Sequence, residues 1–130
     1  MICGVHAIIG AALGKSLKKK EQAFLAGVAS HVIADFIPHK DLTPESEVPL
    51  VFATLALIGL GEGWKSPAFW GAIGATLPDL ENAVSYLRKD LPCIFPTHTG
   101  RHGAKVEEVA SQIGIALICL AVMVNEENYV

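Results

Sequence analysis

The sequence predicts an all-α protein, a compact bundle of about five to six helices that forms one domain over residues 1–130. Helical signals dominate, and no segment shows the sustained apolar–polar alternation of a half-buried β-strand. Hydrophobic residues make up 52% of the chain and charged residues only 18%, whereas a typical soluble domain has about 25% charged residues. With a mean hydropathy of +0.44, this composition favours helices that lie in or against a membrane, or a soluble protein with large buried interfaces.

Glycine, proline and lysine divide the first half of the chain into three helical segments. The first covers about Gly4–Leu13 and ends at Gly14, before a lysine-rich stretch. A second helix is expected over about Lys20–Asp35. The polar stretch Asp41–Glu47 reads as a loop and a helix start, and the segment Val48–Leu60, apolar on every face, ends in a group of nearby glycines.

Prolines and glycines likewise set the boundaries expected in the second half. An apolar helix over Pro67–Leu77 is expected to stop at Pro78, because proline interrupts the interior of a helix. A short amphipathic piece, Leu80–Leu87, follows it. The segment 91–103 contains two prolines, two glycines and two histidines and is expected to be irregular. The last helix is expected over about Ala104–Val124.

The apolar segments predict a membrane location. Every uninterrupted apolar run is shorter than the roughly 20 residues of a typical spanning helix, but helices with Gly, Ser, His and Asp on a protein-facing side can still span. We expect an integral or tightly associated protein of the cell inner membrane with membrane lipid as a partner, and a cytoplasmic bundle is the alternative. A net charge of −3 with one basic run, Lys15 and Lys18–Lys20, predicts no nucleic-acid partner. The apolar faces could also support a homo-oligomer.

The segment 30–39 places two imidazoles and a carboxylate within an apolar stretch. His31 and Asp35 are four residues apart and share one face of a helix. Pro38 marks the expected helix end, and His39 follows it, where it could fold back toward the pair. A buried carboxylate needs a cation, a donor or a metal. From these residues alone, a structural His–Asp pair and half of a metal site are equally good interpretations.

Other ligand-type side chains also interrupt apolar or irregular segments, and each has a structural alternative. His6 could be a hydrogen-bonded core residue, and His39 could interact with the negative end of a helix. Asp79 after Pro78 could cap a helix, with Glu81 in its first turn. Glu45 and Glu47 read as solvated or capping residues. Two more histidines, His98 and His102, are again four apart, with Arg101 between them suited to an anion.

Two of these motifs resemble a family of small bacterial proteins described as membrane-bound metal-dependent hydrolases. One comprises His6 followed by Gly10, the stretch 27–31, Asp35 and Pro38–His39, and the other is the stretch 74–82, which contains the motif Leu77-Pro78-Asp79-Leu80-Glu81. That family is distantly similar to the all-α zinc-dependent phospholipase C and nuclease superfamily, which binds a metal cluster through His-x-x-x-Asp helices. The resemblance covers the chain from His6 to about His102.

The resemblance implies a set of metal ligands and departs from the family in several places. The metal ligands that it implies, together with the loop histidines, are His6, His31, Asp35, His39, Asp79, His98 and His102. Glu81 stands where the family has a second Asp, and Asn82 where it often has a His. The order of the motifs also differs from that of inner-membrane members, and a second His-x-x-x-Glu helix is missing. We therefore expect one or two metals, not three.

These expectations combine into one leading hypothesis and one alternative. The leading hypothesis is a membrane-associated, metal-dependent hydrolase, in which a divalent ion, most simply Zn²⁺, activates a water against a phosphoester of a small molecule or a lipid. Glu81 is then the candidate general base and Arg101 the candidate anion clamp. The alternative is a non-catalytic small helical membrane or metal-binding protein, in which the His and Asp residues join helices.

Overall fold

The computed structural model describes residues 1–88, 90, 94 and 109–126 of the chain, and within them the fold is all-helical, with five α-helices and no β-strand. The helices are α1 (Cys3–Lys15), α2 (Lys20–Ala34), α3 (Pro44–Glu62), α4 (Pro67–Leu87) and α5 (Ala110–Glu126). The expected helical class is confirmed. Each of the five helices has at least one end within two residues of an expected limit. Residues 104–108 of the expected last helix lie outside the described part.

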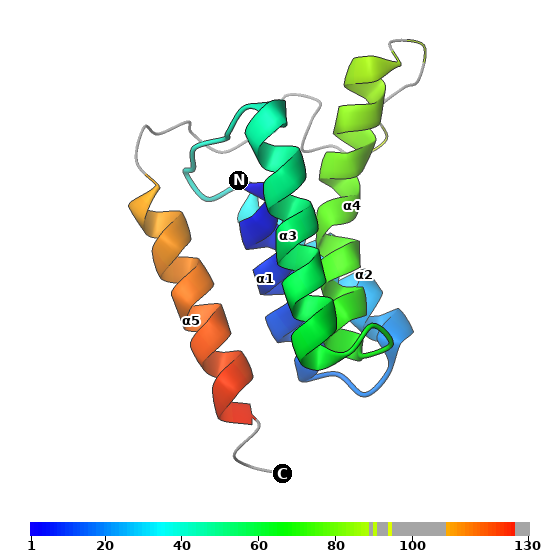
Figure 1. Ribbon diagram of the computed structural model, residues 1–130, viewed down its shortest axis with the longest axis vertical. Helices are drawn as coiled ribbons and strands as arrows, with labels where there is room; N and C mark the ends of the chain where they lie inside the picture. Colours follow the sequence, from blue (N-terminus) through cyan, green and yellow to red (C-terminus); the bar gives the residue numbers. More distant parts are fainter. Residues whose placement is uncertain (89, 91–93, 95–108, 127–130) are drawn as a thin grey trace.

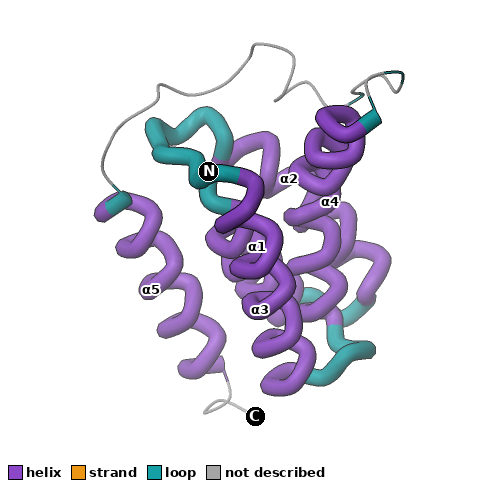
Figure 2. Tube along the Cα trace, turned by 45° about the horizontal axis from the view of Figure 1, so that its top comes forward, coloured by secondary structure: helices purple, strands orange, loops and turns teal. Residues whose placement is uncertain are grey.

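Successive helices run in alternating directions along the bundle (Figure 1). α1 occupies the centre and packs against each of the other four helices, and α4 also packs against α2 and α3. α5 stands to one side, next to α1 (Figure 2). The start of α1, the end of α2 and the loop before α3 meet at the end that is uppermost in Figure 1, which we call the upper end.

Glycines allow α4 to approach α1 and α2 at backbone distance. A Cβ placed on Gly71 would overlap the Gly10 carbonyl of α1, and one on Gly74 would overlap the Phe24 carbonyl of α2. Small buried residues of α1 and α4, among them Ala7, Ala11 and Ala72, fill the same interface. The three helices α1, α2 and α4 therefore form a tightly packed unit, which we call the inner helices.

Pro78 does not end α4, and the expectation of two separate helical pieces was wrong at this point. The helix continues from Pro67 to Leu87 with Pro78 in its interior, and the Pro78 side chain is among the most deeply buried. An interior proline removes one backbone hydrogen bond, but a tightly packed neighbourhood can hold the helix in register. Asp79 consequently lies in the middle of a helix, so its interpretation as an N-cap is excluded.

α3 and α5, which we call the outer helices, leave large apolar side chains exposed. Leu57 and Leu60 on α3 are 70% and 73% exposed, and Leu117 and Ile118 on α5 are 61% and 67% exposed. Among the described residues, only α3 is both long and apolar enough to cross a membrane, with a mean hydropathy of 1.2. Only 11% of that apolar stretch is buried within the protein. Soluble core helices can satisfy the same length and composition test, but they are mostly buried.

Candidate metal centre

Three ligand-type side chains from three helices converge at the upper end of the inner helices. His6 comes from α1, His31 from α2 and Asp79 from α4, and each offers one ligand atom within 4.8 Å of the others. Both histidines are fully buried, and Asp79 is 23% exposed. The two imidazole rings stack, with their centroids 3.9 Å apart. Residues that are far apart in the sequence thus form one compact group that could hold a metal ion.

Asp35 joins the two histidines from the end of α2. Its Oδ1 accepts a hydrogen bond from His6 Nε2 at 2.9 Å, and its Oδ2 lies 3.3 Å from His31 Nε2. Burial alone would raise the pKa of Asp35, but the hydrogen bonds with His31 and His6 outweigh it and hold that pKa below its usual range. The carboxylate therefore stays ionised in a buried position, as a support for the histidines.

The hydrogen bonds fix which nitrogen of each histidine carries a proton. A carbonyl oxygen can only accept, so His31 Nδ1 donates to the Ala75 carbonyl at 2.8 Å. His6 Nε2 donates to Asp35 for the same reason. The other nitrogen of His6, Nδ1, is buried without a hydrogen-bond partner among the described residues. Such an arrangement, in which one nitrogen is anchored and the other is available, is typical of metal-binding histidines.

His31 Nε2 faces two carboxylates, and this geometry requires a cation. It lies 3.3 Å from Asp35 Oδ2 and 3.8 Å from Asp79 Oδ1. When His31 is neutral, Nδ1 holds its proton, so the lone pair of Nε2 points at two negative oxygens. Burial would lower the pKa of His31, but the hydrogen bond with Asp35 and the charges of Asp79 and Asp35 raise it above its usual value. A proton or a metal ion at Nε2 relieves the same repulsion.

The pKa of His6 is shifted in the opposite direction from that of His31. Burial lowers the pKa of His6 below its usual value, although the hydrogen bond with Asp35 opposes this effect. Neutral imidazole is the form that binds metals. The lowered pKa of His6 favours its neutral, metal-binding form, whereas the raised pKa of His31 means that a proton competes with a metal ion for its Nε2.

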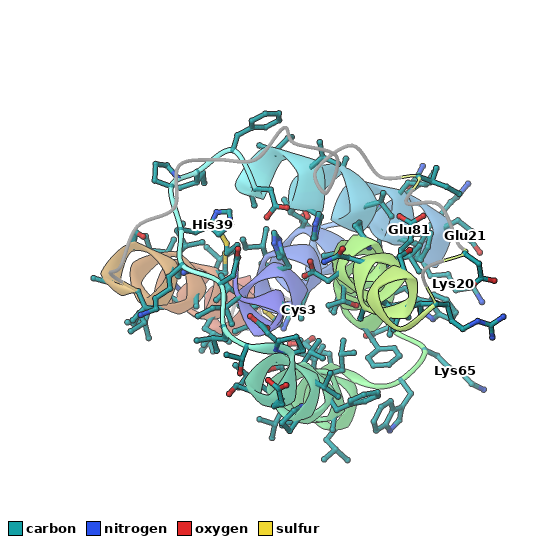
Figure 3. All side chains as sticks on the ribbon, turned by 90° about the horizontal axis from the view of Figure 1, so that it is seen from above. Cys3, Lys20, Glu21, His39, Lys65 and Glu81 are labelled. Carbon is teal, nitrogen blue, oxygen red and sulfur yellow. The ribbon has the colours of Figure 1, made fainter. Side chains whose placement is uncertain are left out.

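His39 lies near this group but is not one of its members. It is fully buried, donates from Nδ1 to the Ile37 carbonyl at 2.6 Å, and places Nε2 3.1 Å from Asp41 Oδ1. The Met1 α-ammonium lies 2.9 Å from Asp41 Oδ1 and 3.1 Å from Asp35 Oδ1. His39 is thus linked to Asp35 through Asp41 and the ammonium group, and Figure 3 shows it to one side of the bundle axis.

The two candidate catalytic residues and the loop histidines have other positions. Glu81 accepts a hydrogen bond from the Ile94 backbone N–H at 2.8 Å. In the view along the bundle, Glu81 lies away from Cys3 (Figure 3). It is not among the three residues that converge. Arg101, His98 and His102 lie outside the described residues.

Several residues at the upper end were not singled out as site residues from the sequence. Glu47 of α3 accepts hydrogen bonds from the backbone N–H groups of Cys3 and Leu42, so it caps α1 from another helix. Burial, followed by the charge of Asp79 and a hydrogen bond with it, raises the pKa of the Cys3 thiol. Gln112 of α5, fully buried, accepts from the Ile2 N–H and donates to the Lys40 carbonyl, both at 2.8 Å. The sequence signal available for Glu47 was its position as an acidic residue in the first turn of α3, where backbone N–H groups lack partners within the helix.

Comparisons of the chain with protein-family models, with curated proteins and with solved structures each found no match.

Proposed function

We propose that this protein binds a divalent metal ion through His6, His31 and Asp79. The observation that carries the proposal is the environment of His31 Nε2, which faces the carboxylates of Asp35 and Asp79 while its Nδ1 is anchored to a backbone carbonyl. Two imidazoles and one carboxylate form a ligand set that suits zinc, with a fourth position left for water or substrate. Asp35 would then orient the histidines from behind.

We propose hydrolysis of a phosphoester as the reaction of the metal-bound protein. A bound divalent ion would supply an activated water at neutral pH. Asp35 would keep the hydrogen on His6 Nε2 and so direct His6 Nδ1 toward the ion. Asp79 is 23% exposed, so the group of ligands is not wholly closed to solvent. The resemblance of the two sequence motifs to metal-dependent hydrolases favours this reaction over binding alone.

We also propose that the protein is embedded in a membrane through its outer helices. α3 has 19 residues and is about 28 Å long, which nearly matches the hydrocarbon core of a bilayer. Most of its apolar residues, Leu57 and Leu60 among them, are exposed and not packed in a core, which is the reverse of what a soluble core helix shows. Extraction of the protein by high salt without detergent would contradict this placement.

Zinc titration of the purified, chelator-treated protein by calorimetry tests the metal proposal. We expect one equivalent to bind, and Asp79→Asn to weaken binding by roughly tenfold or more, because it removes a charged ligand without changing the side-chain shape. Asp90→Asn is the matched control, since Asp90 is 69% exposed and pairs only with Arg88 at the surface in the described part. Absence of stoichiometric zinc binding, or equal affinities of the two variants, would contradict the proposal.

The reaction is tested separately from binding. Zinc-loaded protein should hydrolyse generic phosphoesters, soluble or presented in lipid vesicles, and Asp79→Asn should lose this activity at a zinc concentration that saturates it. Stoichiometric zinc without turnover of either substrate class would contradict the hydrolase proposal. That result would favour a metal-binding role without catalysis.

A further inference from the structure

The lower end of the bundle carries a group of exposed lysines and both tryptophans of the chain. Lys18, Lys19 and Lys20 precede or begin α2, and Lys65 lies in the connection before α4, all of them exposed. Trp64 and Trp70 are 53% and 36% exposed. Lysine and tryptophan together are typical of the level at which a protein meets lipid headgroups. We call this group of residues the lysine–tryptophan end.

An open groove of about 420 Å³ lies at this end between the starts of α2 and α4. It is lined by Lys20, Glu21, Phe24, Leu25 and Trp70. The Lys20 ammonium stands over the Trp70 ring, 5.8 Å from its centroid. Lys20 and Glu21 project on the same side of the bundle as Lys65 (Figure 3). Lys20 and Glu21 are the charged residues of the groove, and apolar side chains form the rest of its lining.

Further apolar side chains are exposed along α2 beyond the groove. Leu25 and Ile33 on α2 are 66% and 68% exposed, and Phe36, just after the end of the helix, is 59% exposed. From Leu25 to Ile33 this apolar track is about 12 Å long, at 1.5 Å per residue. This length suits a lipid acyl chain, whereas free phosphate would use the lysines and leave the track empty.

We propose that the groove binds an anionic phospholipid. Its phosphate would lie near Lys20 with Lys18 and Lys19 close by, and one acyl chain would lie along Leu25 and the outer face of α2. The charge of the lysines favours an anionic over a zwitterionic lipid by roughly fivefold for each lysine that reaches the headgroup region. This inference rests on the proposed membrane placement but not on the proposed metal chemistry.

Tryptophan fluorescence offers a direct test, because the only two tryptophans lie at this end. In Trp64→Phe, Trp70 is the sole tryptophan. This variant is placed in lipid nanodiscs that contain equal amounts of phosphatidylcholine and phosphatidylglycerol, with bromine on one lipid or on the other. We expect brominated phosphatidylglycerol to quench Trp70 severalfold more strongly than brominated phosphatidylcholine does.

Charge variants identify the source of this preference. Replacing Lys18, Lys19 and Lys20 by glutamine should abolish the difference between the two lipids, while Lys40→Gln at the upper end should leave it unchanged. The triple variant should keep the helical circular dichroism and the unfolding midpoint of the unchanged protein, which shows that it is folded and keeps this test separate from the metal proposal.

Three results would overturn the proposal. Equal quenching by both lipids would contradict the anionic preference while still placing Trp70 in the bilayer. Absence of quenching by either lipid in a monomeric protein would contradict both the groove proposal and the membrane placement. Protection of Trp70 from both lipids in a protein that is dimeric by light scattering would assign the groove to a second copy of the chain.

Discussion

The inner and outer helices use similar apolar compositions in opposite ways. α1, α2 and α4 meet through glycines such as Gly10, Gly71 and Gly74, so that their backbones nearly touch. α3 and α5 instead turn leucines and isoleucines outward, as Leu60 and Ile118 show. Among the described residues, the three metal candidates that converge lie on the inner helices. Apolar content therefore does not locate the site; what distinguishes the inner helices is close packing around buried ionisable groups.

The largest expected effect comes from the buried carboxylate of the inner helices. Asp35→Ala should lower the free energy of unfolding by about 3–5 kcal/mol, because it leaves His6, His31 and the Met1 ammonium without their shared anion. Denaturant unfolding in detergent, followed by circular dichroism, measures this loss. Asp90→Ala at the surface should change stability by less than about 1 kcal/mol. Similar losses in both variants would contradict the central role of Asp35.

Glycine substitutions compare the two kinds of helix directly. Gly71→Ala should cost about 1–3 kcal/mol, because the new methyl group overlaps the backbone of α1. Gly114→Ala in α5, where a Cβ would meet nothing within 4 Å, should stabilise the protein by about 0.5–1 kcal/mol. The same unfolding assay applies. If the two changes have the same sign, the inner helices are not packed as described.

The pH dependence of stability sharpens the account of the site. The pKa of His31 is raised in the folded protein, so its contribution is fully present below about pH 6.5 and is lost as the pH rises through the folded pKa. The pKa of Asp35 is lowered, so its contribution is present above about pH 4 and is lost as the pH falls.

His6, whose pKa is lowered, acts in the opposite sense to His31 and reduces stability as the pH falls below about 6.5, so the metal-free protein should be most stable near the upper of these two limits. Zinc should replace the His31 proton, so the stabilisation that it provides should increase from pH 6 to pH 8. Thermal unfolding of chelated and zinc-loaded protein across this range measures both trends. A zinc effect that does not depend on pH would show that His31 is not a ligand.

The smallest effect is expected on the outer face of α3. Leu60→Ala should change stability in detergent by no more than about 0.5 kcal/mol, since Leu60 is 73% exposed. Ile58→Ala, two residues away and only 8% exposed, is the matched control and should cost at least about 2 kcal/mol. Equal costs would mean that α3 is packed on both faces and would remove the main support for its contact with lipid.

The sequence could predict what depends on local patterns. The four-residue spacing of His31 and Asp35 placed them on one helix face, and the resemblance of the Pro-Asp motif to metal-dependent hydrolases implied Asp79 as a further metal ligand. The choice between a structural pair and a metal half-site could not be made locally, because it depends on Ala75 and Asp79, which approach His31 from a different helix.

Other features of the site depended on tertiary packing that the sequence does not reveal. The expected stop at Pro78 failed because close packing by α1 and α2 keeps α4 continuous through the proline. Glu47 and Gln112 act on backbone groups that lie 44 and 110 residues away in the chain. No local periodicity signals such contacts. Glu81 shows the opposite case, because it belongs to a sequence motif but accepts a hydrogen bond from Ile94 and is not part of the metal group.

X-ray absorption spectroscopy of the zinc-loaded protein tests the central claim most directly. The account predicts two imidazole ligands at about 2.0–2.1 Å, with oxygen ligands completing the sphere. His6→Ala should leave one imidazole, while His39→Ala should leave two, because His39 lies outside the three-residue group. A zinc sphere without imidazole, or one that loses an imidazole in His39→Ala but not in His6→Ala, would contradict the account.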